Sequence, residues 1–415
     1  MLLTLAKESL FSRKKTAVLT FISLTISMLV LLSVEHLRIQ AKESFNRTIT
    51  GADLIIGAPS GQINLLLYSV FRMGSPTNNI QYQSFEVLQK HPNISWLIPI
   101  SLGDSHRGFK VLGTNEQYFE HFRYGDERKL AFAFGKGLSG ELDGYFDAVV
   151  GADVAETLGY KVGDEIVVSH GIGSSSFKHH DDSPFSVVGV LQRTGTPVDK
   201  TVHVTLQGVE IMHFSPPKLK KFIEAPQSFE VEVDSITAVI VGLKNKFATF
   251  KLQRQVNNYK KDRLMAILPG VALAELWELV GTLENILRVV AALVLLAALI
   301  GLSTMLLASI NERRAEIAVF RVLGAGPLKI MLLIYLEAIV LTLLSMATAF
   351  GLLWIGLVVF ADSIGTVYGL FISANVFTLA LAKLMGFALL AALLTAVIPS
   401  IAVYKSALHR QLMAR

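Results

Sequence analysis

The sequence predicts a membrane α-helical protein with four transmembrane helices and a large α+β domain between the first and the second helix. Two observations support this fold class. Of the 415 residues 52% are hydrophobic, and the mean hydropathy of +0.50 exceeds that of an ordinary soluble domain. The excess lies in four runs, 16–37, 284–310, 330–360 and 375–404. Each run is long enough to cross a hydrocarbon core, which takes about 20 apolar residues.

The first run, TAVLTFISLTISMLVLLSV, is predicted to be a retained helix. It is longer than the apolar region of a secretory signal peptide, and no A-x-A-like cleavage site follows it. Segment 1–40 therefore comprises a cytoplasmic N-terminus and the first transmembrane helix.

Basic residues in the short flanking segments predict the orientation, because Lys and Arg accumulate on the cytoplasmic side. Loop 361–374 has none, whereas the other short segments carry Lys7, Arg13, Lys14, Lys15, Arg313, Arg314, Arg321, Lys329, Lys405, Arg410 and Arg415. We therefore expect both termini to be cytoplasmic, in the inner membrane of a bacterium. The net charge of +5 is explained by this topology and gives no reason to expect nucleic acid.

The same rule assigns the remaining segments. Helices two and three are expected at 284–310 and 330–360, with a cytoplasmic segment 311–329 between them, and 375–415 holds helix four and the cytoplasmic tail. Residues 41–283 form the outer α+β domain with stalk helices, and 361–374 is a short outer loop. Arg288 and Lys383 fall near the outer ends of their helices, where they can reach the lipid headgroups.

The outer domain combines alternating strand patterns with short helices. Strands are predicted at 147–151, 165–169, 185–191, 202–206 and 236–243, and helices at 152–158 and 247–257. Segment 256–285 is largely helical in pattern apart from Pro269-Gly270, and its last part continues into the second transmembrane helix. The apolar segment 63–71 is interpreted as core, with an exposed lip for lipophilic cargo as the alternative.

The cytoplasmic segment NERRAEIAVFRVLGAGPLKI, residues 311–330, has the pattern of a short amphipathic helix. Ile317, Phe320 and Leu323 share one side, Gly324 is a suitable C-cap, and Gly326-Pro327 prevents simple continuation. Two interpretations remain open. It is either a plain basic loop of the positive-inside type or an element that receives force from a cytoplasmic partner.

Three stretches resemble one family. ERRAEIAVFRVLGAGPLKI, followed by IYLEAIVL with Glu337, is similar to the membrane half of the FtsX/MacB/LolC-type permeases. DAVVGADVAETLGYKVGDEIVV and FSVVGVLQRTGTPVDKTVHVTL resemble strand–helix–strand and strand–turn–strand motifs of the periplasmic domain of these proteins. They are the membrane subunits of mechanotransmitting ABC transporters.

The resemblance implies a MacB-like periplasmic domain and a division of labour. Two permeases, the second being an identical or related copy, pair with a dimer of cytoplasmic ABC ATPases that bind ATP and Mg. The segment after the second helix contacts the ATPase, and Glu337 supports it. The contact residues carried over are Glu312, Arg313, Arg314, Glu316, Arg321, Leu323, Gly324, Ala325 and Gly326.

The residues themselves give no sign of an enzyme. No G-x-x-x-x-G-K-[ST] loop occurs, so ATP hydrolysis is expected in the separate subunit and no cofactor in this chain. The chain has no cysteine, which excludes disulfides, thiolate metal sites and thiol catalysis.

A Gly/Ser-rich stretch, SHGIGSSSFKHHDDSPF, gathers imidazoles and carboxylates, which suit Zn²⁺. The candidate ligands are His170, His179, His180, Asp181 and Asp182. The alternative is a solvated polar loop without metal, and the family resemblance lends the cluster no support.

Three functions follow from these observations. The leading one is a permease that relays ATPase motion to periplasmic domains, for export or extraction of lipoprotein or lipophilic cargo, with a periplasmic binding or adaptor protein and membrane lipid as further partners. The second is a permease of a zinc-linked transport or handling system. The third is a regulator that transports nothing and acts on a periplasmic partner.

Overall fold

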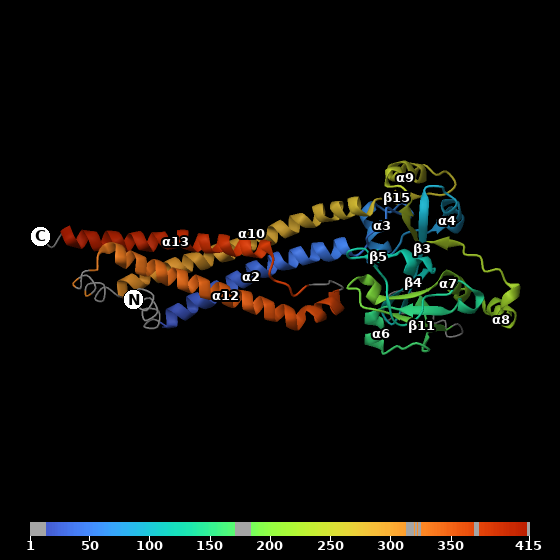
Figure 1. Cartoon of the computed structure of the whole chain (residues 1–415), viewed down its shortest axis with the longest axis horizontal. Coiled ribbons are helices and arrows are strands. Elements are labelled where there is room, and N and C mark those ends of the chain that lie inside the picture. Colours follow the sequence, from blue (N-terminus) through green and yellow to red (C-terminus); the bar gives the residue numbers. More distant parts are fainter. Residues whose placement is uncertain are drawn as a thin grey trace. The chain divides into compact units, whose positions relative to one another are not determined.

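The computed structural model describes residues 14–170, 184–312, 319, 322, 325–368 and 373–412. The chain divides into two compact units, whose elements are drawn in Figure 1. The helical unit comprises the chain up to Gln40 together with Gly281–Asp362 and Ile372–Arg415. The sheet unit comprises Ala41–Val280 and Ser363–Phe371.

Four long helices form the helical unit: α2 (Lys14–Arg47), α10 (Pro269–Glu312), α12 (Pro327–Tyr368) and α13 (Leu379–Leu412). Among the described residues each contains a stretch long and apolar enough to cross a membrane, within Lys14–Arg47, Pro269–Ala308, Leu328–Phe360 and Leu379–Ala402. The prediction of four transmembrane helices is confirmed.

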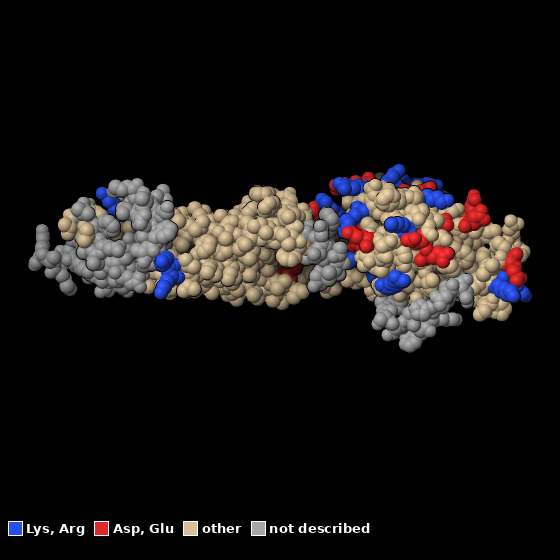
Figure 2. Space-filling view, turned by 90° about the horizontal axis from the view of Figure 1, so that it is seen from below, with Lys and Arg blue, Asp and Glu red and all other residues tan. Residues whose placement is uncertain are grey.

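The helices pack through one apolar stripe each and expose the opposite side. On α2, Leu24, Met28 and Leu32 recur every four residues and are at most 1% exposed, whereas Leu19 and Ile26 are more than half exposed. Exposed apolar side chains of this kind are suited to contact with lipid tails. On the face shown in Figure 2, charged side chains gather on the sheet unit, and the helical unit presents a long uncharged stretch.

Hydrogen bonds from side chains to backbone carbonyls join three of these helices. The Tyr335 hydroxyl of α12 donates to the Leu393 carbonyl of α13 at 2.8 Å. The Ser345 hydroxyl of α12 donates to the Phe21 carbonyl of α2 at 3.3 Å. Because lipid offers no competing water, such bonds help to fix which helix faces pack together.

Two sequence expectations differ from the structure. The helical pattern assigned to 256–268 is wrong at Met265–Ile267, which forms strand β15 and pairs with β1; Ala266 and Ile267 are at most 2% exposed there. Burial in a sheet overrides the local helix pattern, and α10 begins only at Pro269, a residue suited to the first helical turn. In addition, α12 continues through 361–368, which was expected to be loop.

The sheet unit is built on one large mixed sheet with strand order β15-β1-β14-β3-β4-β12-β8-β11-β7. Strand β9 (Glu165–Ile166) pairs with β11, and β10 (Ser169–His170) pairs with β3. The strands of the main path are β1 (Leu54–Gly57), β3 (Ile94–His106), β4 (Phe109–Thr114), β7 (Phe132–Gly135), β8 (Asp147–Val150), β11 (Phe185–Leu191), β12 (Thr201–Thr205), β14 (Ala238–Leu243) and β15 (Met265–Ile267).

Most neighbours in this sheet are antiparallel, but β4 with β12 and β8 with β11 run parallel. Two further pairs lie outside the sheet, β2 (Ile80–Gln81) with β13 (Ser235–Ile236) and β5 (Arg123–Tyr124) with β6 (Arg128–Lys129). The accompanying helices are α3 (Gln62–Ser69), α4 (Tyr82–Gln89), α5 (Gln117–His121), α6 (Ala152–Leu158), α7 (Leu206–Met212), α8 (Pro216–Glu224) and α9 (Thr249–Asn257). The α+β prediction is confirmed.

Helix α3 settles the two interpretations of the apolar segment 63–71. Leu65, Leu66 and Tyr68 are at most 1% exposed and pack in one cluster with the sheet residues Ile98 and Ile240. The core interpretation is therefore correct for this segment, and the exposed lip is not formed by these side chains.

His203 is a buried titratable group at the centre of the sheet unit. Its imidazole Nδ1 lies 3.2 Å from the Val149 carbonyl oxygen, and the rings of Tyr118 and Phe119 lie 5.0 and 5.7 Å from it, centre to centre. Burial, with the nearby Arg72 as a second cause, lowers the pKa of His203 from 6.5 to about 3. The folded protein therefore keeps this ring neutral throughout the neutral range.

His203 should make the stability of the sheet unit depend on pH. The unfolded chain binds a proton at His203 below pH 6.5 and the folded chain only near pH 3, so the stabilisation is complete above pH 6.5 and declines as the pH falls. Between pH 6.5 and about pH 3, His203→Phe should reduce the slope of the unfolding free energy against pH by about 1.4 kcal/mol per pH unit. An equal slope for the wild type and for His203→Phe would contradict the assignment.

Candidate functional site

Four charged side chains connect α2 with α10 inside the helical unit. The Glu35 carboxylate accepts hydrogen bonds from Arg38 Nη2 at 2.7 Å, from Arg288 Nε at 3.2 Å and from Arg288 Nη2 at 3.3 Å. Arg38 Nη1 also lies 3.6 Å from the carboxylate of Glu284. We call Glu35, Arg38, Glu284 and Arg288 the charged cluster; its centre is one carboxylate shared by two guanidinium groups.

The environment of the charged cluster makes it stronger than an isolated surface ion pair. The side chains of Glu35 and Glu284 are only 14% and 19% exposed, and that of Arg38 is 24% exposed. Charge-assisted bonds in such partly buried surroundings are weakened less by solvent. The position of Arg288 in the sequence predicts contact with lipid headgroups, whereas in the structure its guanidinium donates to Glu35. The cluster therefore fixes α2 against α10.

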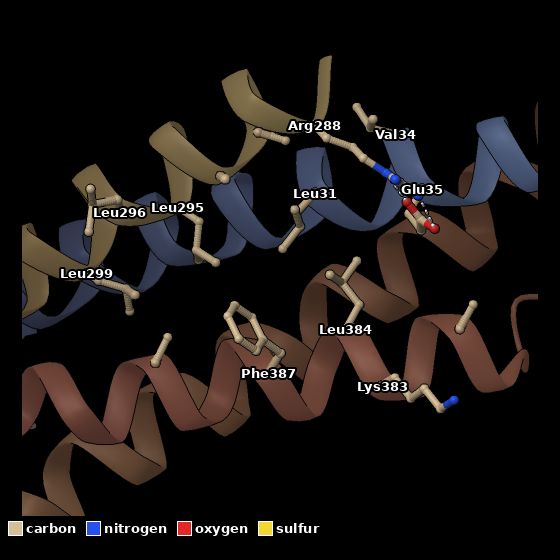
Figure 3. A pocket seen from close by; sticks show the side chains of 14 residues that line it. Leu31, Val34, Glu35, Arg288, Leu295, Leu296, Leu299, Lys383, Leu384 and Phe387 are labelled. Atoms are coloured by element: carbon tan, nitrogen blue, oxygen red, sulfur yellow. Dashed lines mark hydrogen bonds and ion pairs between the residues drawn. The ribbon is translucent and has the colours of Figure 1, made fainter. Parts of the chain in front are cut away.

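An apolar groove of about 840 Å³ lies beside the charged cluster (Figure 3). Helices α2, α10 and α13 all contribute to it. Figure 3 shows Glu35, Arg288 and Lys383 toward one end and Leu296 and Leu299 toward the other, with Phe387 between them. The remaining lining residues are Leu31, Val34, Ala291, Ala292, Leu295, Ala380, Leu384 and Ala391. Such a groove suits a ligand with a long apolar part and a polar end.

Two polar residues of α2 hold the segment that precedes α13. A ring nitrogen of His36, Nε2, lies 3.0 Å from the Ser373 carbonyl oxygen, and the Gln40 Oε1 atom accepts a hydrogen bond from the Ser373 backbone N–H at 3.0 Å. His36 is fully buried. Sequence reasoning did not identify these residues, although a histidine and a glutamine at i and i+4 next to an apolar run were a usable signal.

The predicted ATPase-contact residues fall largely outside the described residues. Six of them, Arg313, Arg314, Glu316, Arg321, Leu323 and Gly324, lie outside the described residues. Glu312 is the last residue of α10, while Ala325 and Gly326 immediately precede α12. The supporting residue Glu337 lies on α12 and is fully buried.

The proposed zinc ligands are likewise mostly outside the described part of the chain. His179, His180, Asp181 and Asp182 are not described, and the backbone of His170 pairs with Asp104 in strands β10 and β3. Within the described ranges no group of three or more His, Asp and Glu residues is arranged to hold a metal. The zinc site remains a hypothesis that the structure does not test.

Two family matches identify the architecture. The MacB-like periplasmic core domain matches residues 17–259, more than half of the chain, and the FtsX-like permease C-terminal domain matches residues 288–408. The chain is an ABC transporter permease of the FtsX/MacB family. The first match contains the sheet unit up to α9, and the second contains the groove residues of α10 and α13.

The permease was also compared with individual proteins. The crystal structure of the periplasmic region of MacB from Actinobacillus actinomycetemcomitans is similar at 13% identity and a TM-score of 0.34, over 55% of this chain and 94% of that one. A comparison with curated proteins gave no match. The family assignment of the permease therefore rests on the two family matches.

The two carboxylates of the charged cluster should contribute differently to the unfolding free energy of the permease. Glu35→Gln removes the charge that two arginines share and should lower the unfolding free energy of the solubilised permease by about 1–3 kcal/mol. Glu284→Gln, with similar burial but one arginine at 3.6 Å, should cost less than about 1 kcal/mol. Thermal unfolding in detergent compares them, and equal losses would contradict the central role of Glu35.

Proposed function

We propose that this permease relays the motion of separate cytoplasmic ABC ATPases to its sheet unit on the periplasmic side of the inner membrane, for export or extraction of lipoprotein or other lipophilic cargo. One observation carries the proposal. Helix α10 is continuous from Pro269, directly after sheet strand β15, to Glu312, where the predicted ATPase-contact segment begins.

A relay needs its helices anchored in the domain that they move. At its end in the sheet unit, α2 places Phe45 against Phe71, with ring centres 4.6 Å apart, and against Trp277 of α10 at 5.5 Å in an edge-to-face arrangement. The indole Nε1 of Trp277 also donates to Asn46 of α2 at 3.4 Å. Aromatic pairs of this kind add to the packing energy of the buried area. These contacts hold the end of α2 and the start of α10 together within the sheet unit.

The same two helices are connected a second time by the charged cluster in the helical unit. Two helices that are joined at two positions along their length transmit displacement better than one helix that can slide along its neighbour. In this proposal the pair formed by α2 and α10 is the moving part. Because α2 and α10 line part of the groove, its shape then changes when these helices move.

Segment 311–329, which we call the input segment, receives the motion of the ATPase. Its basic and acidic residues dock on an ATPase dimer that binds ATP and Mg, and both chain termini lie in the cytoplasm. A second permease copy completes the complex, and a periplasmic binding or adaptor protein acts on the sheet unit. Glu337, buried on α12, anchors the input segment from the membrane side.

No observation among the described residues favours the two alternative functions. The zinc-linked system depends on the undescribed loop, and calorimetry of the permease with Zn²⁺ decides whether it binds metal. The regulator is disfavoured by the size of the outer domain, which is larger than in family members that act in that way.

The input segment should be required for stimulation of the ATPase. In a complex reconstituted with its ABC ATPase, Arg313→Glu with Arg314→Glu should reduce ATP hydrolysis to the level of the ATPase alone, because reversed charges prevent docking. Glu337→Ala should weaken the stimulation, and Lys15→Glu, a charge reversal at the start of α2, serves as the control.

Full stimulation in the double variant and in Glu337→Ala would remove this assignment. The chain has no native cysteine, so a single Val322→Cys substitution gives an independent check. Val322 is 88% exposed, and a membrane-impermeant thiol reagent should label it only from the cytoplasmic side. Labelling from outside would place the segment on the wrong side of the membrane.

A further inference from the structure

The groove between α2, α10 and α13 is open to the surroundings of the helical unit. Its floor includes the buried Leu295 and Leu299, while Leu296 and Phe387 on its rim are 52% and 67% exposed. Water in such a space would find few hydrogen-bond partners, because polar groups lie only toward one end. An acyl chain, which is apolar along its whole length, suits these apolar walls.

The charges at the polar end do not cancel. Glu35 and Glu284 balance Arg38 and Arg288 within the charged cluster. Lys383 of α13 is an additional cation at the same end of the groove (Figure 3). No carboxylate in the described part of the chain forms an ion pair with Lys383, so this end carries about one unbalanced positive charge that suits an anionic headgroup.

We propose that the groove binds one anionic phospholipid of the surrounding bilayer. The phosphate lies at Lys383, at the end of the groove that also holds Arg288, and an acyl chain extends past Phe387 toward Leu296 and Leu299. A zwitterionic lipid carries its own ammonium group and gains less from an unbalanced lysine. The bound lipid fills the volume that α2, α10 and α13 leave between them.

This inference goes beyond the proposed function, because the ligand is a resident lipid and not the cargo. It holds even if segment 311–329 contacts no ATPase. Failure of the lipid experiment below would likewise leave the stimulation experiment unaffected, so the two proposals can fail separately.

Lipid selectivity tests the role of Lys383. The full chain, purified in detergent, is given phosphatidylglycerol or phosphatidylcholine, and native mass spectrometry measures the lipid retained. The wild type should prefer phosphatidylglycerol. Lys383→Gln should reduce this preference about fivefold, the equivalent of one lysine contact with anionic lipid. Lys15→Gln at the other end of α2 should retain it, and an unchanged preference in Lys383→Gln would overturn the proposal.

Filling the groove tests the acyl-chain site. Ala292 lines the groove and Ala297 does not, although both lie on α10 and are exposed. Ala292→Trp should reduce retention of both lipids, while Ala297→Trp should retain them as the wild type does. Because both side chains are exposed, neither tryptophan has to displace a core residue. Equal retention by the two variants would exclude the groove as the binding site.

A second copy of the permease is the competing occupant. The cysteine-free chain allows Phe387→Cys to report it, because copies packed face to face through the groove would form a disulfide-linked dimer on oxidation. We expect no dimer from this variant. Efficient cross-linking would show that a protein surface and not a lipid covers the groove.

Discussion

The proposed transmission of motion depends on the backbone of α10, because a helix in lipid cannot interrupt its hydrogen bonds without leaving polar groups unsatisfied. Its 44 residues contribute to both units, from Pro269 after β15 to Glu312. An uninterrupted helix resists compression along its axis, so displacement at one end reaches the other. The contacts with α2 limit how far α10 can bend or slide.

Two kinds of contact hold α2 and α10 together, and each suits its surroundings. In the sheet unit the aromatic rings of Phe45 and Trp277 meet, where packing is favoured by the exclusion of water. In the helical unit the contact is electrostatic, with Glu35 between Arg38 and Arg288. The charged cluster also borders the groove, so the element that fixes the two helices gives the groove its polar end. The proposed lipid site and the proposed connection between α2 and α10 therefore both involve Glu35 and Arg288.

The transmembrane helices could be predicted from hydropathy alone, because the length of an apolar run is enough to indicate a membrane-spanning helix. Strand β11 at Phe185–Leu191 was likewise readable from its alternating pattern. Strand β15 was not, since Met265–Ile267 becomes a strand only through pairing with β1. The charged cluster and the contact of His36 with Ser373 depend on how each helix is rotated against its neighbour, and one sequence does not contain that information. The family motif predicts an ATPase-contact segment at 311–329, and most of its residues lie outside the described part of the chain.

The most direct test of transmission through α10 is a break at Gly281, where the helix passes from the sheet unit into the helical unit. Apart from the backbone of its own helix and its chain neighbours, no atom lies within 4 Å of the place that a Cβ on Gly281 would take, so alanine fits there, whereas proline removes a backbone hydrogen bond and breaks the helix. A dye on Phe247→Cys, a position that is 95% exposed in the sheet unit, reports nucleotide-dependent motion in the reconstituted complex. The account predicts that Gly281→Ala keeps the signal and that Gly281→Pro loses it while ATP hydrolysis continues. An undiminished signal in Gly281→Pro would contradict the account.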